Sequence, residues 1–221
     1  MLGPAVGSGQ APFLANWNEA TGELTIVEKY FPPLPRAGES SICGIQSDPV
    51  FGTSAGQRSM AVLIAGARRR LWITNAYFVP PKPFVHALRA AKARGVDVKI
   101  ILPGRYIDQP AVRRASRHTW GKLLEGGVEL YEYEPTMIHC KIVIVDSSVT
   151  SIGSINFDPR SFALNAEFGV VALDRGVAAD FEEAFSTDLR SARRVTADDL
   201  RRLSIGQRMQ DVFCYWIRAQ L

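Results

Sequence analysis

The stretch IHCKIVIVDSSVTSIGSINFDPRS, residues 138–161, predicts a β-hairpin inside a larger sheet. Ile138 to Val145 is a mostly β-branched, apolar run of the kind that forms buried strands. Asp146-Ser147-Ser148 has the composition of a turn. Val149 to Gly153 is then expected to return as the second strand of the hairpin.

Six residues of this stretch follow the spacing H-x-K-x4-D-x6-G-S-x-N, namely His139, Lys141, Asp146, Gly153, Ser154 and Asn156. Because side chains alternate along a strand, His139 and Lys141 are expected on one face, and Ser154 and Asn156 can share a face. Gly153 would let backbone and ligand approach closely. An imidazole, an ammonium, a hydroxyl and an amide are therefore expected to converge on one anion.

This set of groups suits the cleavage of a phosphodiester. Lys141 offers a positive charge with three donors, and Ser154 and Asn156 offer neutral donors to the non-bridging oxygens. His139 can attack phosphorus to form a phosphoramidate, or it can protonate a leaving oxygen. One imidazole cannot do both in the same step, so a complete site needs two, and the pattern occurs once in the sequence.

The spacing resembles the signature of the phospholipase D superfamily, HxKxxxxD followed by GSxN. Further segments resemble the C-terminal half of bacterial cardiolipin synthases: ITNAYFVPP (73–81), RGVDVKIILPG (94–104), YEYEPTMIHCK (131–141) and DPRSFALNAEF (158–168). GPAV (3–6) and NWNEATGE (16–23) resemble the end of that family's N-terminal half. The resemblance covers nearly the whole chain.

The resemblance also implies the roles of particular residues. It implies catalytic roles for His139, Lys141, Asp146 and Glu167, and phosphate contacts for Lys141, Gly153, Ser154 and Asn156. His139 matches the second motif of two-motif members, whose histidine is the general acid and base. Asp146 would be a structural and electrostatic support. Glu167 would hydrogen-bond His139, which would fix its tautomer and stabilise the imidazolium.

The chain also departs from the family's pattern. The first motif is missing, because neither His86 nor His118 is followed by lysine two residues later. The residue between the motif histidine and lysine is usually small but is Cys140 here; strand alternation would point it away from the histidine, and we expect a buried thiol. Pro12 is expected to interrupt the helix that would otherwise form near the N-terminus.

The implied reaction is phosphatidyl transfer of the cardiolipin synthase type, in which two molecules of phosphatidylglycerol, an anionic phospholipid, give cardiolipin and glycerol. Water as the acceptor would make the enzyme a hydrolase instead.

One alternative is a homodimeric single-motif phosphodiesterase or nuclease, with His139 of each copy facing across a two-fold axis. Nucleic acid is a partner only in that case. Another alternative is an incomplete half that is inactive without a separate N-terminal half.

Alternating strands and helices predict an α/β fold, a phospholipase D-like half with a mixed β-sheet flanked by helices on both faces. Strands are expected near 42–46, 71–75, 96–102, 128–132, 139–145, 149–153 and 168–173, and helices around 60–67, 84–91, 110–126 and 177–185. We expect three regions: a remnant of the preceding half with a linker (1–40), the domain with the HKD motif (41–192), and a C-terminal helical tail (193–221).

Composition narrows the remaining possibilities. With 221 residues, 47% of them hydrophobic, the chain can bury a core. Its net charge of +4 is compatible with anionic lipid or nucleic acid and diagnostic of neither. Most arginine groups are expected on solvated helix faces: Arg68 to Arg70, Arg113, Arg114, Arg117, Arg193, Arg194, Arg201 and Arg202. Tyr77 to Pro80 could line a lipid channel or simply pack at a strand end.

Features that the sequence lacks lead to expectations about the location of the protein and its cofactors. Cys43, Cys140 and Cys214 form no C-x-x-C motif, which favours a reducing compartment. Neither a signal peptide nor an apolar run of membrane-spanning length is present. We therefore expect peripheral attachment to the cytoplasmic side of a bacterial inner membrane. The sequence contains no metal-ligand cluster, so neither a metal nor another cofactor is predicted.

Overall fold

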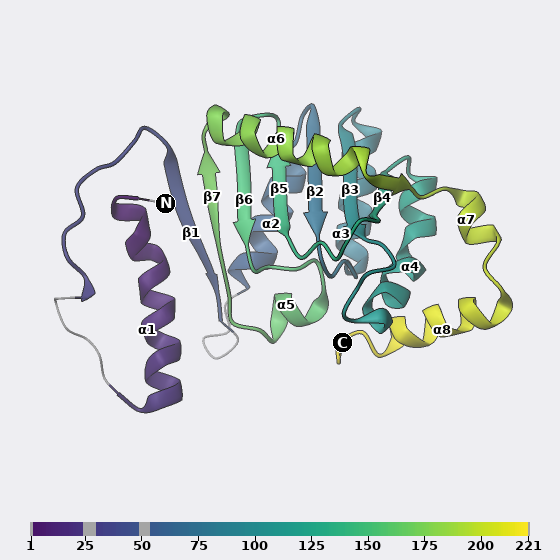
Figure 1. Cartoon of the computed structure of the whole chain (residues 1–221), viewed down its shortest axis with the longest axis horizontal. Helices are drawn as coiled ribbons and strands as arrows, with labels where there is room; N and C mark the ends of the chain where they lie inside the picture. The colour runs from purple at the N-terminus through teal and green to yellow at the C-terminus, as the bar shows by residue number, and fades with distance from the viewer. Residues whose placement is uncertain (1, 24–29, 49–53, 221) are drawn as a thin grey trace.

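A mixed β-sheet with the strand order β1-β7-β6-β5-β2-β3-β4-β8 forms the centre of the molecule (Figure 1). The computed structural model describes residues 2–23, 30–48 and 54–220. The strands are β1 (Ser41–Ser47), β2 (Arg70–Asn75), β3 (Asp97–Pro103), β4 (Glu129–Tyr133), β5 (Lys141–Val145), β6 (Val149–Gly153), β7 (Glu167–Leu173) and β8 (Ala192–Arg194). β2, β3 and β4 run parallel, and the other neighbours pair antiparallel. The predicted α/β fold with a mixed sheet is confirmed.

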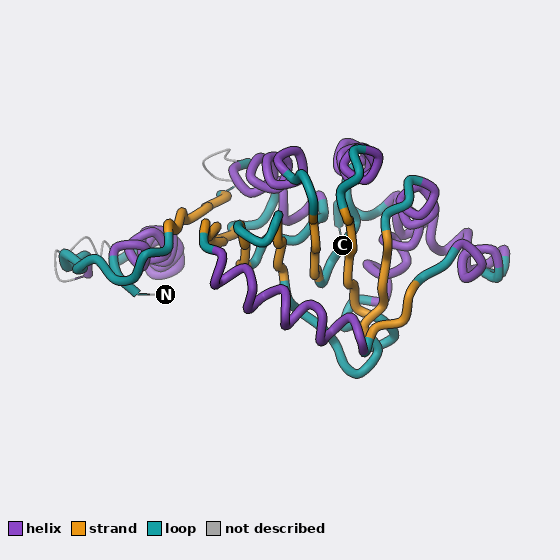
Figure 2. The backbone as a smooth tube through the Cα atoms, turned by 90° about the horizontal axis from the view of Figure 1, so that it is seen from above, coloured by secondary structure: helices purple, strands orange, loops and turns teal. Residues whose placement is uncertain are grey.

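Helices cover both faces of this sheet, as predicted (Figure 2). The helices of the described residues are η1 (Pro4–Val6, a 3-10 turn), α1 (Gly7–Thr21), α2 (Ala55–Gly66), α3 (Lys82–Ala93), α4 (Pro110–Glu125), α5 (Pro159–Ala163), α6 (Arg175–Arg190), α7 (Ala197–Arg201) and α8 (Ile205–Trp216). Helix α6 covers one face, and α2, α3 and α4 cover the other.

Strand alternation divides the core into two layers. Leu71 and Ile73 of β2 pack with the α2, α3 and α4 side chains, whereas Trp72 between them faces α6. The Trp72 ring stacks on Phe185 of α6 with ring centroids 4.8 Å apart. Because both faces are covered, the central strands are apolar on both sides, which explains their continuous hydrophobic runs.

One local prediction needs correction. Helix α1 runs through Pro12, so the predicted interruption is wrong. A proline removes one backbone donor, and the Pro12 carbonyl accepts a hydrogen bond from the Asn16 side chain at 3.0 Å within the next turn. The region expected as a C-terminal helical tail contains α7 and α8, and its first two residues belong to β8, which pairs with β4. Only three residues long, β8 is too short for a detectable side-chain period.

The predicted hairpin is present as β5 and β6. Asp146 and Ser147 at its tip both have positive φ, 51° and 54°. The Ser148 N–H donates to the Val145 carbonyl at 3.1 Å, as expected of a type I′ turn. This turn matches the right-handed twist of the flanking strands and fixes their register.

The Asp146 carboxylate joins the hairpin tip to the start of β2. It accepts hydrogen bonds from the backbone N–H groups of Arg68, Arg69 and Arg70 at 2.9, 2.7 and 2.8 Å. Burial acts to raise the pKa of Asp146, but these hydrogen bonds outweigh it and lower the pKa. Asp146 lies at the opposite end of β5 from Lys141, roughly 16 Å along the strand. It therefore has a structural role.

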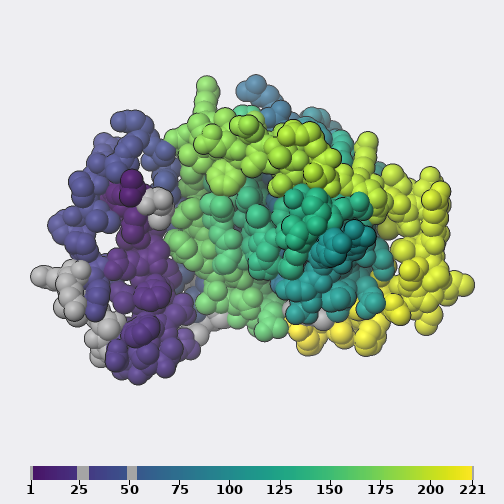
Figure 3. All heavy atoms as spheres, viewed as in Figure 1, coloured from purple at the N-terminus to yellow at the C-terminus, as the bar shows by residue number. Residues whose placement is uncertain are grey.

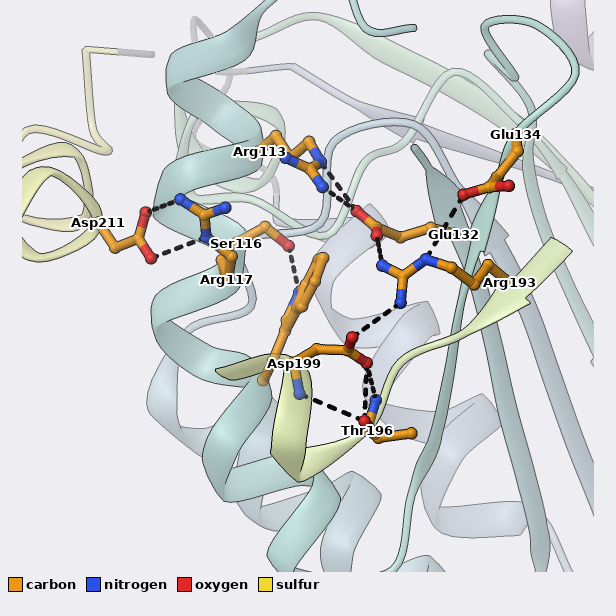
Figure 4. Close-up of polar contacts among 10 residues, drawn as sticks. Arg113, Ser116, Arg117, Glu132, Glu134, Arg193, Thr196, Asp199 and Asp211 are labelled. Atoms are coloured by element: carbon orange, nitrogen blue, oxygen red, sulfur yellow. Dashed lines mark hydrogen bonds and ion pairs between the residues drawn. The ribbon is translucent and has the colours of Figure 1, made fainter. Parts of the chain in front are cut away.

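Buried ion pairs fasten the C-terminal elements (Figure 4). Glu132 of β4 is 2% exposed and binds Arg113 of α4 and Arg193 of β8. Arg117 of α4 makes a bidentate pair with Asp211 of α8, at 2.8 and 2.6 Å. Arg113, Arg117 and Arg193 therefore hold elements together. A solvated face does not describe Arg113 and Arg117, whose side chains are 27% and 11% exposed, whereas Arg193 is paired but remains 42% exposed.

We predict that Asp211→Ala lowers the free energy of unfolding by about 3–5 kcal/mol, because Arg117 would be left nearly buried without its partner. The side chains of Arg117 and Asp211 are only 11% and 6% exposed. Chemical denaturation measures the effect. Asp198→Ala is the matched control, since it removes an exposed pair with Arg201 that is worth below about 1 kcal/mol. Equal losses in the two variants would contradict the prediction.

We also predict that Asp146→Asn lowers the free energy of unfolding at pH 7 by about 2 kcal/mol, because charged hydrogen bonds to three N–H groups are lost. The folded-state pKa is lowered, so the stabilisation is present above the unfolded pKa, roughly 3.9, and is lost as pH falls below it. Urea denaturation between pH 7 and pH 3 should show the two proteins converging in acid. Asp180→Asn, on an exposed position of α6, should change little at any pH.

Candidate active site

His139 and Lys141 meet at the edge of the sheet where β2 ends and β5 begins. Lys141 is the register partner of Asn75, the last residue of β2. Its Nζ lies 3.0 Å from Nδ1 and 3.2 Å from Nε2 of His139. His139 precedes β5 rather than lying within it, yet the two side chains meet as the spacing predicted. Burial lowers the pKa of Lys141, although the nearby charge of Glu167 opposes the shift.

Glu167, the first residue of β7, organises the neighbouring side chains. Its carboxylate, 7% exposed, accepts hydrogen bonds from Ser154 Oγ, from Ser161 Oγ at 2.7 Å and from Asn165 Nδ2 at 3.3 Å. Across the described residues, none of its hydrogen bonds goes to His139, so the bond expected there is not formed. Three other donors occupy its oxygens, and the charge of Glu167 acts on Lys141.

Gly153 and Ser154 hold β6 close to β7. A Cβ on Gly153 would lie 2.4 Å from the Phe168 carbonyl oxygen and from Gly169 Cα, so any side chain would force the strands apart. Ser154 Oγ accepts the Phe168 N–H at 3.0 Å while it donates to Glu167. The close approach that requires glycine is therefore to the neighbouring strand, and the exposed Ser154 is left at the edge of the site.

Asn156 accepts a hydrogen bond from the backbone of Tyr77 and keeps one amide group available. Its Oδ1 accepts the Tyr77 N–H at 3.3 Å, and its backbone N–H donates to Ser161 Oγ at 2.8 Å. Its Nδ2 makes no hydrogen bond to any residue that the structure describes, although Asn156 is only 7% exposed. Such a donor is suited to an oxygen of a bound ligand.

Tyr77, which the sequence placed either in the lining of a lipid channel or in the packing of a strand end, forms one wall of the site. Its ring meets the His139 ring edge-on, with centroids 5.5 Å apart, and Lys141 Nζ lies 5.8 Å from its centroid. Burial and a hydrogen bond to Asp108 raise the pKa of Tyr77. Phe78 is buried in the core, so only the first residue of the segment 77–80 contacts the motif. The sequence signal for Tyr77 was its position directly after β2, the strand that pairs with β5.

Asn75 and Ser161 are two further positioning residues that sequence reasoning missed. Asn75 Oδ1 accepts the Phe157 N–H at 3.2 Å, which ties the end of β2 to the segment after β6. Ser161 lies in α5, whose N-cap Asp158 accepts the Ser161 N–H at 2.7 Å. Burial raises the pKa of Asp158. Small polar residues of this kind give no periodic signal, so their roles depend on the fold.

Cys140 is exposed, so the prediction of a buried thiol is wrong. Because β5 begins at Lys141, Cys140 lies in the preceding loop rather than inside the sheet. Although the residue is exposed, partial desolvation of its sulfur raises the pKa of the thiol, and the charge of Asp188 of α6 adds to the shift. Among the described residues, no three His, Cys, Asp or Glu side chains gather where they could hold a metal ion.

Comparison with known proteins places this site in a family. Residues 60–189 match the family described as "Cardiolipin synthase, PLD-like domain". The chain is 32% identical over 199 residues to cardiolipin synthase 2 of Staphylococcus epidermidis, covering 89% of this chain and 41% of the relative. It is 35% identical over 206 residues to cardiolipin synthase A of Pseudomonas entomophila, covering 91% and 41%. The chain thus spans about two fifths of the length of these relatives.

Solved structures agree with this placement. The phospholipase D family member Nuc from Salmonella typhimurium has a TM-score of 0.63 and 26% identity, covering 72% of this chain and 100% of that one. Phosphatidylserine synthase of Haemophilus influenzae has a TM-score of 0.66 at 16% identity, covering 82% and 48%, and is similar in fold alone. The chain therefore belongs to the phospholipase D-like domain family of the cardiolipin synthases.

Proposed function

We propose that this chain supplies the C-terminal half of the catalytic site of a phosphatidyltransferase of the cardiolipin synthase type. The observation that carries the proposal is the contact of Lys141 with His139 in a chain of this family, with Tyr77 contacting both of them and hydrogen-bonded to Asn156. An ammonium and an amide donor at one edge suit the non-bridging oxygens of a phosphodiester. The substrate we propose is phosphatidylglycerol.

In the first step a histidine from outside this chain attacks the phosphorus of one phosphatidylglycerol. An N–P bond forms as the P–O bond to glycerol breaks, and His139 donates a proton to the departing glycerol oxygen. In the second step the hydroxyl of another phosphatidylglycerol gives its proton to His139 and attacks phosphorus. The N–P bond breaks, and cardiolipin is released.

The other residues hold the phosphate and the imidazole in place. Lys141 would pair with the phosphate, whose negative charge favours the ammonium form and opposes the pKa lowering caused by burial. Glu167 fixes the orientation of Ser154 at the edge of the site. The Tyr77 ring packs against one side of His139 and restricts its rotation. These contacts prepare the site before substrate binds.

The second histidine is proposed to come from an N-terminal half or from a second copy of the chain.

Cytoplasmic, peripheral association with the bacterial inner membrane completes the proposal. Within the described residues, none of the helices has both the length and the apolar character needed to cross a bilayer. Membrane contact by this part of the chain would therefore involve its surface.

We predict that His139→Gln lowers phosphatidyl transfer by at least about 10³-fold, since its removal eliminates the proton transfers in both steps. Turnover of phosphatidylglycerol vesicles, followed by release of glycerol, measures the effect in the complete, active assembly. His86→Gln is the matched control, because His86 is exposed on α3 away from the site, and it should retain full activity. Wild-type turnover in the His139 variant would refute the proposed role.

We further predict that the chain alone turns over little lipid and gains activity when an N-terminal half is supplied. The probe is the part of the Staphylococcus epidermidis relative that precedes the matched region, added in trans. Light scattering gives the mass of the chain alone, expected near 24.3 kDa. Full turnover by a species of twice that mass, with no added half, would instead mean that two copies complete one site.

A further inference from the structure

Helix α8 presents a row of apolar side chains away from the protein. Its members and their exposed fractions are Ile205 (80%), Met209 (68%), Val212 (42%), Phe213 (64%) and Trp216 (80%). The steps of four, three, one and three residues place them on one side of the helix. We call these five residues the α8 stripe. A surface helix usually turns such a row toward the core, so this orientation is the reverse of the ordinary one.

The opposite side of α8 fixes that orientation. Asp211, which is nearly buried, makes the bidentate pair with Arg117 (Figure 4). Cys214 packs with Val79 and with Val112 of α4. Turning the α8 stripe inward would expose these contacts and separate a buried ion pair, which is costly. The stripe is therefore held outward by the packing of the helix.

A basic cavity of about 220 Å³ lies at the seam between α4 and α8. The polar residues that line it are Arg105, Arg113, Arg114, Arg117, Gln207 and Gln210. Arg113 and Arg117 are neutralised by their carboxylate partners. Arg105 and Arg114 have no acidic partner among the described residues, so the cavity has unbalanced positive charge. Arginines and glutamine amides in a concave site match the oxygens of a phosphate group.

Helix α8 and this cavity lie near the segment that contacts the candidate active site. Tyr77, which contacts His139, also packs in the same small apolar cluster as Cys214 and Tyr215 of α8. Asp108, the hydrogen-bond partner of Tyr77, is only three residues from Arg105 of the cavity. In the ribbon view α8 lies at the edge of the sheet where β2 and β3 end (Figure 1). The C-terminal residues form the end of the molecule opposite the N-terminal segment (Figure 3).

We propose that α8 is a membrane-docking helix for bilayers that contain anionic phospholipid. The α8 stripe enters the boundary between headgroups and acyl chains, and Arg105 and Arg114 bind a lipid phosphate beside it. Charge argues for this occupant over a second copy, because a two-fold contact here would bring the unneutralised arginines of two basic chains together. The choice of an anionic phospholipid as the ligand rests on the proposed function. Vesicle binding is measured without lipid turnover, so it is tested independently of the reaction.

The first test compares variants in sedimentation with vesicles of phosphatidylglycerol and phosphatidylcholine in equal parts. The double variant Met209→Ser/Phe213→Ser should lower the partition coefficient by at least about tenfold. Val62→Ser is the matched control, since Val62 is 69% exposed on α2, and it should bind like the wild type. All three substituted side chains are exposed, and circular dichroism verifies folding. Trp216 fluorescence should shift to the blue on binding, a shift that Trp216→Phe removes.

The second test separates charge from apolar contact. Arg105→Gln/Arg114→Gln should lower binding to the mixed vesicles by on the order of tenfold and leave the weak binding to pure phosphatidylcholine unchanged. Arg36→Gln/Arg89→Gln removes the same net charge elsewhere and should bind nearly as well as the wild type. Inorganic phosphate should compete for the cavity but should not displace the α8 stripe, which distinguishes a lipid headgroup from a free-phosphate site.

Several results would overturn the proposal. The first is that the wild type does not bind vesicles. The second is that the stripe variant binds them as well as the wild type does. The third is that the wild type is a dimer, and that the stripe variant is a monomer with unchanged vesicle binding. His139→Gln keeps failure of docking distinct from failure of the proposed reaction. That variant should bind vesicles normally while turnover is lost.

Discussion

The antiparallel pairing of β5 with β2 is the interaction on which the rest of the structure depends. It joins the parallel part of the sheet to the antiparallel part, and its register sets Lys141 opposite Asn75. Each end of the pair is fastened by polar contacts. Asp146 holds the N–H groups at the start of β2, and Asn75 holds the Phe157 N–H at the other end. A one-residue slip would turn the lysine to the other face of the sheet.

The buried carboxylate of Glu167 organises the side of the site that carries Ser154 and Asn156. A carboxylate removed from water is costly unless donors surround it, and here Ser154, Ser161 and Asn165 supply them. Ser161 also accepts the Asn156 backbone N–H, so one buried charge positions two of the groups expected to contact phosphate. The motif residues are thus held by a network whose centre lies on the next strand along the sheet.

The C-terminal helices show a different balance of forces. Helix α8 turns Asp211, Cys214 and Tyr215 toward α4 and the α8 stripe outward. The bidentate pair between Arg117 and Asp211 stabilises this arrangement together with a small apolar cluster. An outward apolar stripe beside unneutralised arginines, next to the segment that contacts His139, connects the proposed membrane contact with the proposed chemistry.

Sequence alone determined the strands with strong β-branched runs and the hairpin turn, because these depend on local propensity. The closeness of His139 and Lys141 follows from their separation of two residues, although His139 lies just outside the strand. Tertiary structure alone decided that Asp146 fastens the far end of the sheet and that Glu167 binds Ser154 rather than the histidine. It also decided that Arg113, Arg117 and Arg193 pair with buried carboxylates, and that α8 faces outward. These outcomes depend on which residues distant in sequence become neighbours, and no local pattern encodes that.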